Sequence, residues 1–254
     1  MTTRGIDDAV SGSDARASPH GLPLAGAIRL PRTSRFDLSC GRVPDWTYHP
    51  LFKPLLFRLP PEEARDLTLR LLQVQATTAA GRRLFRLFAP PPPAPRHALT
   101  VFGQRFASPV GLGPGIDTEA IALTLLQHLG LGFLQVGPVA AEAAPRRFAH
   151  DPLRLRAARA LVSTPLAGAP GAAALAARVE RTVDLHTPVG FALTGPDLAA
   201  AIGAAHRAAS FFSVPVTGAE RADQLGALRA LTDKPVLLRL PHDLPDRDLD
   251  ALIE

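Results

Sequence analysis

The sequence predicts an α/β protein of about five βα units, preceded by a small two-helix module. Short apolar runs alternate with helix-like segments from residue 109 to the end of the chain. These runs are apolar on both faces, which is typical of a parallel sheet covered by helices. With 254 residues and 46% hydrophobic content, the chain can also bury a sizeable core.

Three parts of the chain differ in composition and periodicity. Residues 1–44 are rich in Ser, Gly, Asp, Arg and Pro without periodicity, so we expect a disordered tail. Residues 45–95 contain helical patterns with wide apolar faces and basic flanks, and they end in a proline-rich linker. Residues 96–254 hold a predicted hairpin, with Gly103 and Gln104 in its turn, and then the βα units.

The βα units follow one another with a single long interruption. The predicted strands are 109–113, 132–137, 189–194, 210–216 and 235–240. The predicted helices are 118–129, 171–184, 197–207, 219–231 and one that starts near Pro245. Residues 138–170 are expected to form a long irregular βα loop, the kind that carries function. A (β/α) barrel closes with eight units, whereas an open doubly wound sheet would require a reversal of strand order.

Composition excludes several classes of function. The formal charge of +5 comes almost entirely from arginine, since Lys53 and Lys234 are the only lysines, so the charge is weak support for a nucleic-acid partner and we predict none. A single cysteine, Cys40, excludes an internal disulfide, and the eight histidines show no local metal spacing. No apolar run reaches about 18 residues, and the N-terminus shows no charged-then-apolar signal pattern. We therefore expect a cytoplasmic protein.

The helical module 45–95 allows two interpretations. Wide apolar faces, basic flanks and a rigid linker suit insertion into a membrane interface, so the protein could be peripheral on the inner face of the cell membrane. The same faces also suit packing against the main domain, since an apolar helix face more often belongs to a core. The sequence leaves both interpretations open.

Four segments resemble one family in order and spacing, from about Tyr48 to Glu254. They are YHPLFKPLLFRLPPEEARDLTLRLL, LTVFGQRFASPVGLGPGIDTEAI, LGLGFLQVGPV and KPVLLRLPHDLPDRDLDAL. They resemble the class 2 dihydroorotate dehydrogenases, which are membrane-associated, quinone-dependent flavoproteins of pyrimidine biosynthesis. The resemblance implies a TIM-type (β/α) barrel that is incomplete here, FMN as the cofactor, and oxidation of dihydroorotate to orotate. It also implies that residues 45–95 correspond to the family's quinone-tunnel module.

The same resemblance assigns site positions one by one. Gly113, Gly115 and Gly137 fall in the turns beside the flavin, and Arg239 stands where the family has a flavin-contacting lysine. The family's substrate positions fall on Thr118, in place of a lysine, and on Ser163, in place of an asparagine. Arginine keeps the charge of lysine but changes its shape, whereas threonine supplies no charge for a substrate carboxylate.

The catalytic position departs furthest from the family. The family's serine base falls on Val216, which cannot accept a proton, and Ser213, which falls on a family asparagine, is a weak candidate without an evident partner base. The glycines and apolar strand residues are kept while the polar ligands are lost, and the second half of the barrel is missing. We therefore expect a catalytically inactive, truncated pseudoenzyme whose flavin binding is weak or lost. The alternatives are an active enzyme completed by a second chain that covers the open barrel edge, and a module that binds a membrane surface or quinone through residues 45–95.

Overall fold

The computed structural model describes residues 52–145, 147–148, 152–155, 157–162, 166–215 and 222–240. All of them belong to the compact unit Gly41–Glu254. The predicted tail 1–44 and the predicted last helix from Pro245 lie outside the described residues, as do Ser163 and Val216.

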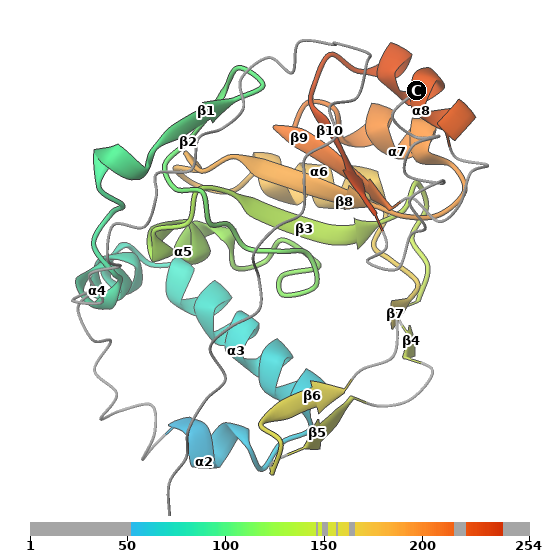
Figure 1. The fold of residues 1–254 in the computed structure, drawn as a ribbon. Helices are drawn as coiled ribbons and strands as arrows, with labels where there is room; N and C mark the ends of the chain where they lie inside the picture. The colour runs from blue at the N-terminus through green and yellow to red at the C-terminus, as the bar shows by residue number, and fades with distance from the viewer. Residues whose placement is uncertain are drawn as a thin grey trace, which may run out of the picture. The chain divides into compact units, whose positions relative to one another are not determined.

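A parallel four-stranded sheet forms the centre of the described chain (Figure 1). Its strands are β3 (Leu134–Val139), β8 (Val189–Leu193), β9 (Phe211–Pro215) and β10 (Val236–Arg239), paired in the order β10-β9-β8-β3. The predicted strand 109–113 is reduced to one parallel bridge, Leu112 to Leu134, next to β3. Neighbours in the sheet are thus neighbours in the chain, and the described strands show no reversal of order. This is the winding of a barrel that is not closed, rather than of a doubly wound sheet.

Helices cover one face of this sheet, as the apolar pattern predicts. They are α5 (Leu123–Leu126), which continues into the 3-10 turn η3 (Gln127–Leu129), then α6 (Ala172–Glu180), α7 (Leu198–Ala205) and α8 (Ala222–Leu231). Residues that alternate along the strands point into this layer and form the core with helix residues. The principal members are Leu134, Val136, Phe191, Leu193, Phe212, Val214, Leu175, Ile202 and Leu228.

The opposite face of the sheet is the interior of the unclosed barrel. At its amino end, the rings of Phe106, Phe133 and Phe211 pack edge to face with centroids 5.7–6.4 Å apart. Phe106 comes from the hairpin of β1 (Leu99–Val101) and β2 (Gln104–Phe106), whose prediction is confirmed. The turn is shifted by one residue, however: Gln104 pairs with Val101, and the turn residues Phe102 and Gly103 have φ of 53° and 74°. Two positive φ values are what a tight two-residue hairpin turn requires.

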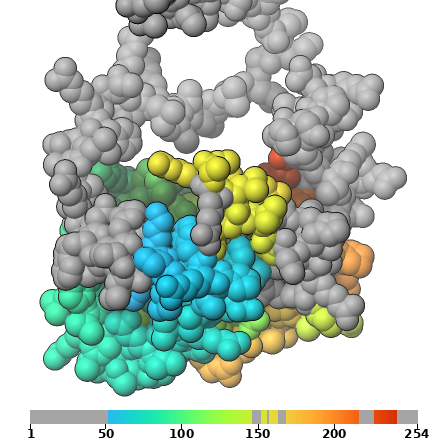
Figure 2. Space-filling view, turned by 90° about the horizontal axis from the view of Figure 1, so that it is seen from below, coloured from blue at the N-terminus to red at the C-terminus, as the bar shows by residue number. Residues whose placement is uncertain are grey.

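The predicted loop 138–170 is more regular than expected. It contains two antiparallel pairs, β4 (Arg147–Phe148) with β7 (Leu166–Ala167), and β5 (Leu153–Leu155) with β6 (Ala160–Val162). Arg154 attaches the β5–β6 hairpin to the turn that follows α2 (Lys53–Leu56). Its guanidinium donates to the carbonyl of Leu59 at 3.2 Å and lies 4.3 Å from the ring centroid of Phe57. Figure 2 shows this hairpin (yellow) against α2 and α3 (blue).

The helical module uses its apolar faces in two different ways. It comprises α2 (Lys53–Leu56), α3 (Pro61–Ala76) and α4 (Ala79–Phe88), followed by the 3-10 turn η2 (Pro95–His97). On α3, Leu69 is buried in the main core and Leu72 packs against it, which agrees with the packing interpretation. On α4 no residue is buried, and Leu87 and Phe88 are 79% and 70% exposed. Within the described residues, no helix has the length and apolarity needed to cross a membrane.

Candidate functional site at the carboxyl edge of the sheet

The carboxyl ends of β3, β8, β9 and β10 meet at one edge, because all four strands are parallel. In (β/α) barrels this edge carries the chemistry. The predicted cofactor residues lie near this edge: Gly113 and Gly115 follow the Leu112 bridge, Gly137 lies near the end of β3 where its pairing with β8 shifts register, and Arg239 ends β10. Their role in binding a cofactor stays a prediction, and the geometry of each residue shows which contacts it can make.

Two of the three glycines are explained by the backbone. The Gly115 N–H donates to the Gly137 carbonyl at 2.9 Å, and both residues have positive φ, 102° and 113°. A Cβ on Gly137 would lie 2.7 Å from the Ala192 oxygen, which real side chains do not tolerate. Gly113 is different, because a Cβ there would meet nothing within 4 Å and its φ is not positive. Neither strain nor packing demands glycine at 113, so open space adjoins the backbone at this position.

Arg239 is the charged side chain of the predicted set. Its guanidinium Nη2 reaches across β9 and donates to the Leu193 carbonyl at the end of β8, at 3.5 Å. Partial burial lowers the pKa of this guanidinium below its usual value. An arginine pKa starts so high that the group stays a cation at neutral pH. Arg239 can therefore offer charge to an anion at this edge.

Ser213 lies in the barrel interior with its hydroxyl already in use. The side chain is 1% exposed, and its Oγ accepts a hydrogen bond from Gln135 Nε2 at 2.7 Å. The bond spans the intervening strand β8, where Gly190 and Ala192 leave room for it. Sequence reasoning missed Gln135 as a partner; the available signal was a lone amide within the apolar run GFLQVG. Through this bond Ser213 links β9 to β3, which is a structural use of its hydroxyl.

Thr118 is buried under α3. It is 2% exposed and lines a cavity of about 70 Å³ together with Arg65, Asp66 and Glu119. The preceding residue, Asp117, accepts hydrogen bonds from the N–H groups of Ile121 and Ala122 at 2.9 and 2.8 Å. Burial raises the pKa of Asp117, and these two hydrogen bonds act in the opposite direction. By accepting these bonds, the Asp117 carboxylate fixes the backbone just before α5. The helix therefore begins at Leu123 rather than at the predicted residue 118.

The described residues of this edge do not fit FMN well. A flavin needs donors for its ring and an anchor for its phosphate. The Gly115 N–H already donates to a protein carbonyl, the buried Ser213 hydroxyl accepts from Gln135, and the predicted set adds only Arg239 as a charged donor. The described part of the chain also holds no cluster of three or more His, Cys, Asp or Glu residues that could bind a metal.

The architecture is that of an α/β protein with an unclosed parallel barrel, and a helical module and a β-hairpin come before the barrel strands in the chain. No protein-family model matches the chain. The dihydroorotate dehydrogenase (quinone) of Mycobacterium tuberculosis H37Rv is 35% identical over 230 residues, which cover 81% of this chain and 63% of that protein. The Mycobacterium marinum protein of the same name is 33% identical over 226 residues, covering 80% and 62%.

Two solved structures share the fold. A crystal structure of DHODH from Eimeria tenella in complex with ferulenol superposes with a TM-score of 0.57 at 17% identity, over 76% of this chain and 62% of that one. The ligand-free form of the Eimeria protein gives a TM-score of 0.58. The chain is thus homologous to the quinone-dependent dihydroorotate dehydrogenases, as its motifs predicted. It spans somewhat less than two thirds of the length of the curated relatives it matches.

Proposed function

We propose that this chain is a dihydroorotate dehydrogenase-like protein that does not catalyse the family reaction by itself. The observation that carries the proposal is the buried hydrogen bond from Gln135 Nε2 to Ser213 Oγ. It commits the serine candidate, Ser213, to a structural bond inside the sheet. The family's base position itself falls on Val216, whose side chain has no group that can take a proton.

The charges at the carboxyl edge support the same proposal. Oxidation of dihydroorotate requires a base for a carbon-bound proton and a cation for the substrate carboxylate. The family's substrate lysine falls on Thr118, which is buried under α3. Arg239 supplies a cation, and a cation alone can hold an anion but cannot remove the proton. Weak binding of FMN or of a carboxylate is therefore compatible with this edge, whereas turnover is not.

Flavin content tests the proposal most directly. We expect the purified full-length chain to be colourless near 450 nm, and to bind added FMN weakly or not at all in a fluorescence titration. We also expect no dihydroorotate-dependent quinone reduction, with the M. tuberculosis relative as the positive control in the same assay. A yellow protein with about one FMN per chain and steady turnover would overturn the proposal.

An active enzyme completed by a second chain is supported by one feature of the sheet. β10 has a strand neighbour on one side only among the described residues, and its Leu237 and Leu238 are 37% and 38% exposed. Such an edge invites pairing with another chain. Affinity purification of the tagged chain from its own host distinguishes the two proposals. Co-purification of a stoichiometric partner together with flavin and activity favours the completed enzyme, whereas a colourless chain alone favours the inactive one.

Binding to a membrane surface or to a quinone is supported by α4. Leu84, Leu87 and Phe88 are 51–79% exposed on a helix that also carries Arg83 and Arg86. Apolar residues beside arginines favour anionic lipid surfaces. We expect the chain to sediment with phosphatidylglycerol vesicles, and the combined Leu84→Ser, Leu87→Ser and Phe88→Ser variant to remain in the supernatant. The same changes at exposed Leu153, Leu161 and Val162 of the β5–β6 hairpin provide the control. Equal sedimentation of both variants would refute a role for α4.

A further inference from the structure

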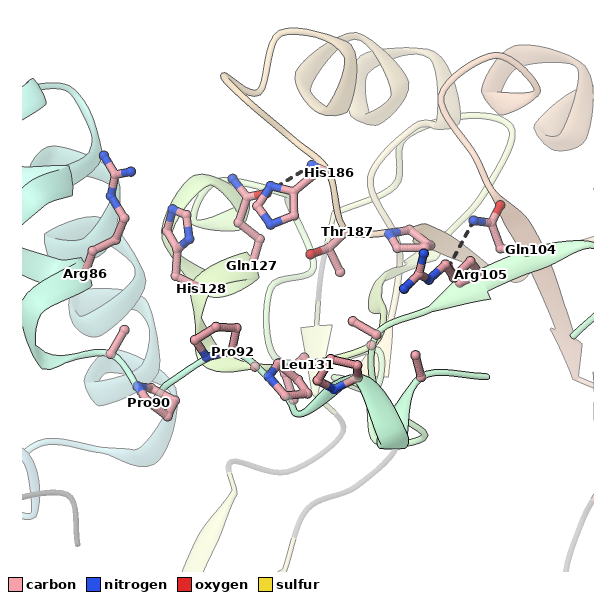
Figure 3. Close-up of a pocket in the computed structure, with 18 residues that line it drawn as sticks. Arg86, Pro90, Pro92, Gln104, Arg105, Gln127, His128, Leu131, His186 and Thr187 are labelled. Atoms are coloured by element: carbon pink, nitrogen blue, oxygen red, sulfur yellow. Dashed lines mark hydrogen bonds between the residues drawn. The ribbon is translucent and has the colours of Figure 1, made fainter. Parts of the chain in front are cut away.

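A second cavity lies at the amino end of the sheet, opposite the edge described above. Its walls are the segments immediately before β3 and β8, strand β2, the end of η3 and the proline-rich linker (Figure 3). Its volume is about 740 Å³. Pockets for small organic molecules have volumes of about 300–1,000 Å³, so this one is large enough for more than an inorganic ion.

Four basic side chains line this cavity, and no acidic residue does. Arg86 of α4, His128 of η3, His186 before β8 and Arg105 of β2 come from four separate segments. Figure 3 shows them in a row, with Arg86 at one end and Arg105 toward the other. In the described part of the chain, none of the four forms an ion pair with a carboxylate. The cavity therefore has an unbalanced positive charge.

His128 lies beside this charge and beside His186, whose backbone is held by a hydrogen bond. Their ring centroids are 5.9 Å apart, and the His186 backbone N–H donates to Gln127 Oε1 at 3.1 Å. Burial lowers the pKa of His128 most, followed by the positive charge of Arg86 and the proximity of His186. An anion in the cavity would reverse the last two effects, because it would attract the same positive charges that now repel one another.

The opposite wall of the cavity is apolar and stiff. Pro90, Pro92 and Leu131 lie on it, across from His186 and Thr187 (Figure 3), and Pro93, Pro95 and Pro188 also line the cavity. Proline has a fixed φ and no N–H, so this wall is preorganised and offers no backbone donor from these residues. Polar groups on one side and a rigid apolar surface on the other are the usual composition of a site for a small organic ligand.

We propose that this cavity binds a small organic anion, a phosphate- or carboxylate-bearing molecule whose apolar body lies on the proline wall. Arg105, His128, His186 and Arg86 recognise the charged groups. The site is separate from the carboxyl edge, so the proposal goes beyond the proposed function and does not depend on it. A solvated basic surface would have the same charges but would show no preference for an apolar body.

Calorimetric titration of the full-length chain tests both halves of the site. The probes are phenyl phosphate, benzoate and inorganic phosphate, at constant ionic strength. We expect phenyl phosphate or benzoate to bind at least about fivefold tighter than inorganic phosphate, and the stronger of the two identifies the anionic group. Arg105→Gln and Arg86→Gln are each expected to weaken binding about tenfold, the typical loss for one charge-assisted hydrogen bond. Arg83→Gln, on the same helix but outside the cavity, is expected to change it less than twofold.

A measurement on the unchanged protein covers the case in which a variant fails to fold. In an NMR titration of the histidine rings, saturating phenyl phosphate is expected to raise the pKa of His128 and to leave that of the distant His206 unchanged. Absence of binding at about 10 mM of every probe would overturn the proposal. So would equal effects of Arg83→Gln and Arg105→Gln, or an equal pKa rise at both histidines, since these outcomes describe general screening of a basic surface.

Discussion

Replacement of Ser213 by alanine tests whether this residue is structural. The change removes the oxygen that accepts from Gln135 Nε2, while Ser213 is 1% and Gln135 is 9% exposed. A buried donor left without a partner costs about 1–3 kcal/mol, because water cannot replace the lost acceptor. We therefore expect Ser213→Ala to lower the free energy of unfolding by about 2 kcal/mol. With a urea slope of about 2 kcal/mol/M, the unfolding midpoint moves down by about 1 M.

A double-mutant cycle isolates the bond from other effects of the substitution. Gln135→Met removes the donor at similar volume, and the double variant with Ser213→Ala leaves no unpaired group. We expect the double variant to be more stable than the sum of the single changes by at least about 1 kcal/mol. The measurement is urea unfolding of the full-length chain followed by circular dichroism. Strict additivity, or a loss below about 0.5 kcal/mol for Ser213→Ala, would refute the structural role.

Three further predictions concern single positions. Gly137→Ala is expected to lower the free energy of unfolding in urea by about 2 kcal/mol or more, because the new Cβ meets a carbonyl and φ is positive. Gly203→Ala on α7, where a Cβ meets nothing within 4 Å, should raise it by about 0.5–1 kcal/mol. Thr118→Lys, which restores the family residue, is expected to destabilise by about 1–3 kcal/mol and not to increase FMN binding in a fluorescence titration, because the side chain is 2% exposed under α3. The folded-state pKa of His128 lies below its usual 6.5, so the folded state binds fewer protons and stability is lost as pH falls from above 6.5 through the folded pKa. His128→Gln should therefore lose less stability than the unchanged protein between about pH 7 and 5, and an identical pH profile would contradict the assignment.

The parts of the fold that follow from periodicity were predictable. β3, β8, β9 and β10 lie within two residues of their predicted bounds, because strands that are apolar on both faces have few alternatives. The strand at 109–113 is shorter than predicted: it forms one parallel bridge at Leu112, and backbone hydrogen bonds join Val110 and Leu112 to residues 132–135. The hairpin turn was misplaced by one residue, because a non-glycine residue such as Phe102 seldom adopts positive φ.

The sequence indicated where the candidate site lies, but not the hydrogen bonding or burial of its side chains. In the structure Gly115 bonds to Gly137, and Arg239 bonds to Leu193 at the end of β8, while their role in cofactor binding stays a prediction. The occupation of Ser213 by Gln135 could not be foreseen, since 78 residues separate the two partners. The burial of Thr118 depends on α3 in the same way, because no local pattern shows which helix covers a turn. Contacts between distant segments decide whether a recognised motif is free to react.

The two ends of the sheet differ in a way that a scaffold kept only for folding would not explain. At the carboxyl edge, small residues and one arginine stand where the resemblance expects a set of polar ligands. At the amino end, four basic side chains from separate segments surround a cavity without an acidic neighbour in its lining. Burial, and after it the positive charge of Arg86, lowers the pKa of His128, so a charged His128 costs stability in this cavity. An anion would relieve the cost, because it stabilises the folded chain in proportion to its own binding. The proposed anion binding at the amino end is therefore independent of whether the carboxyl edge is active.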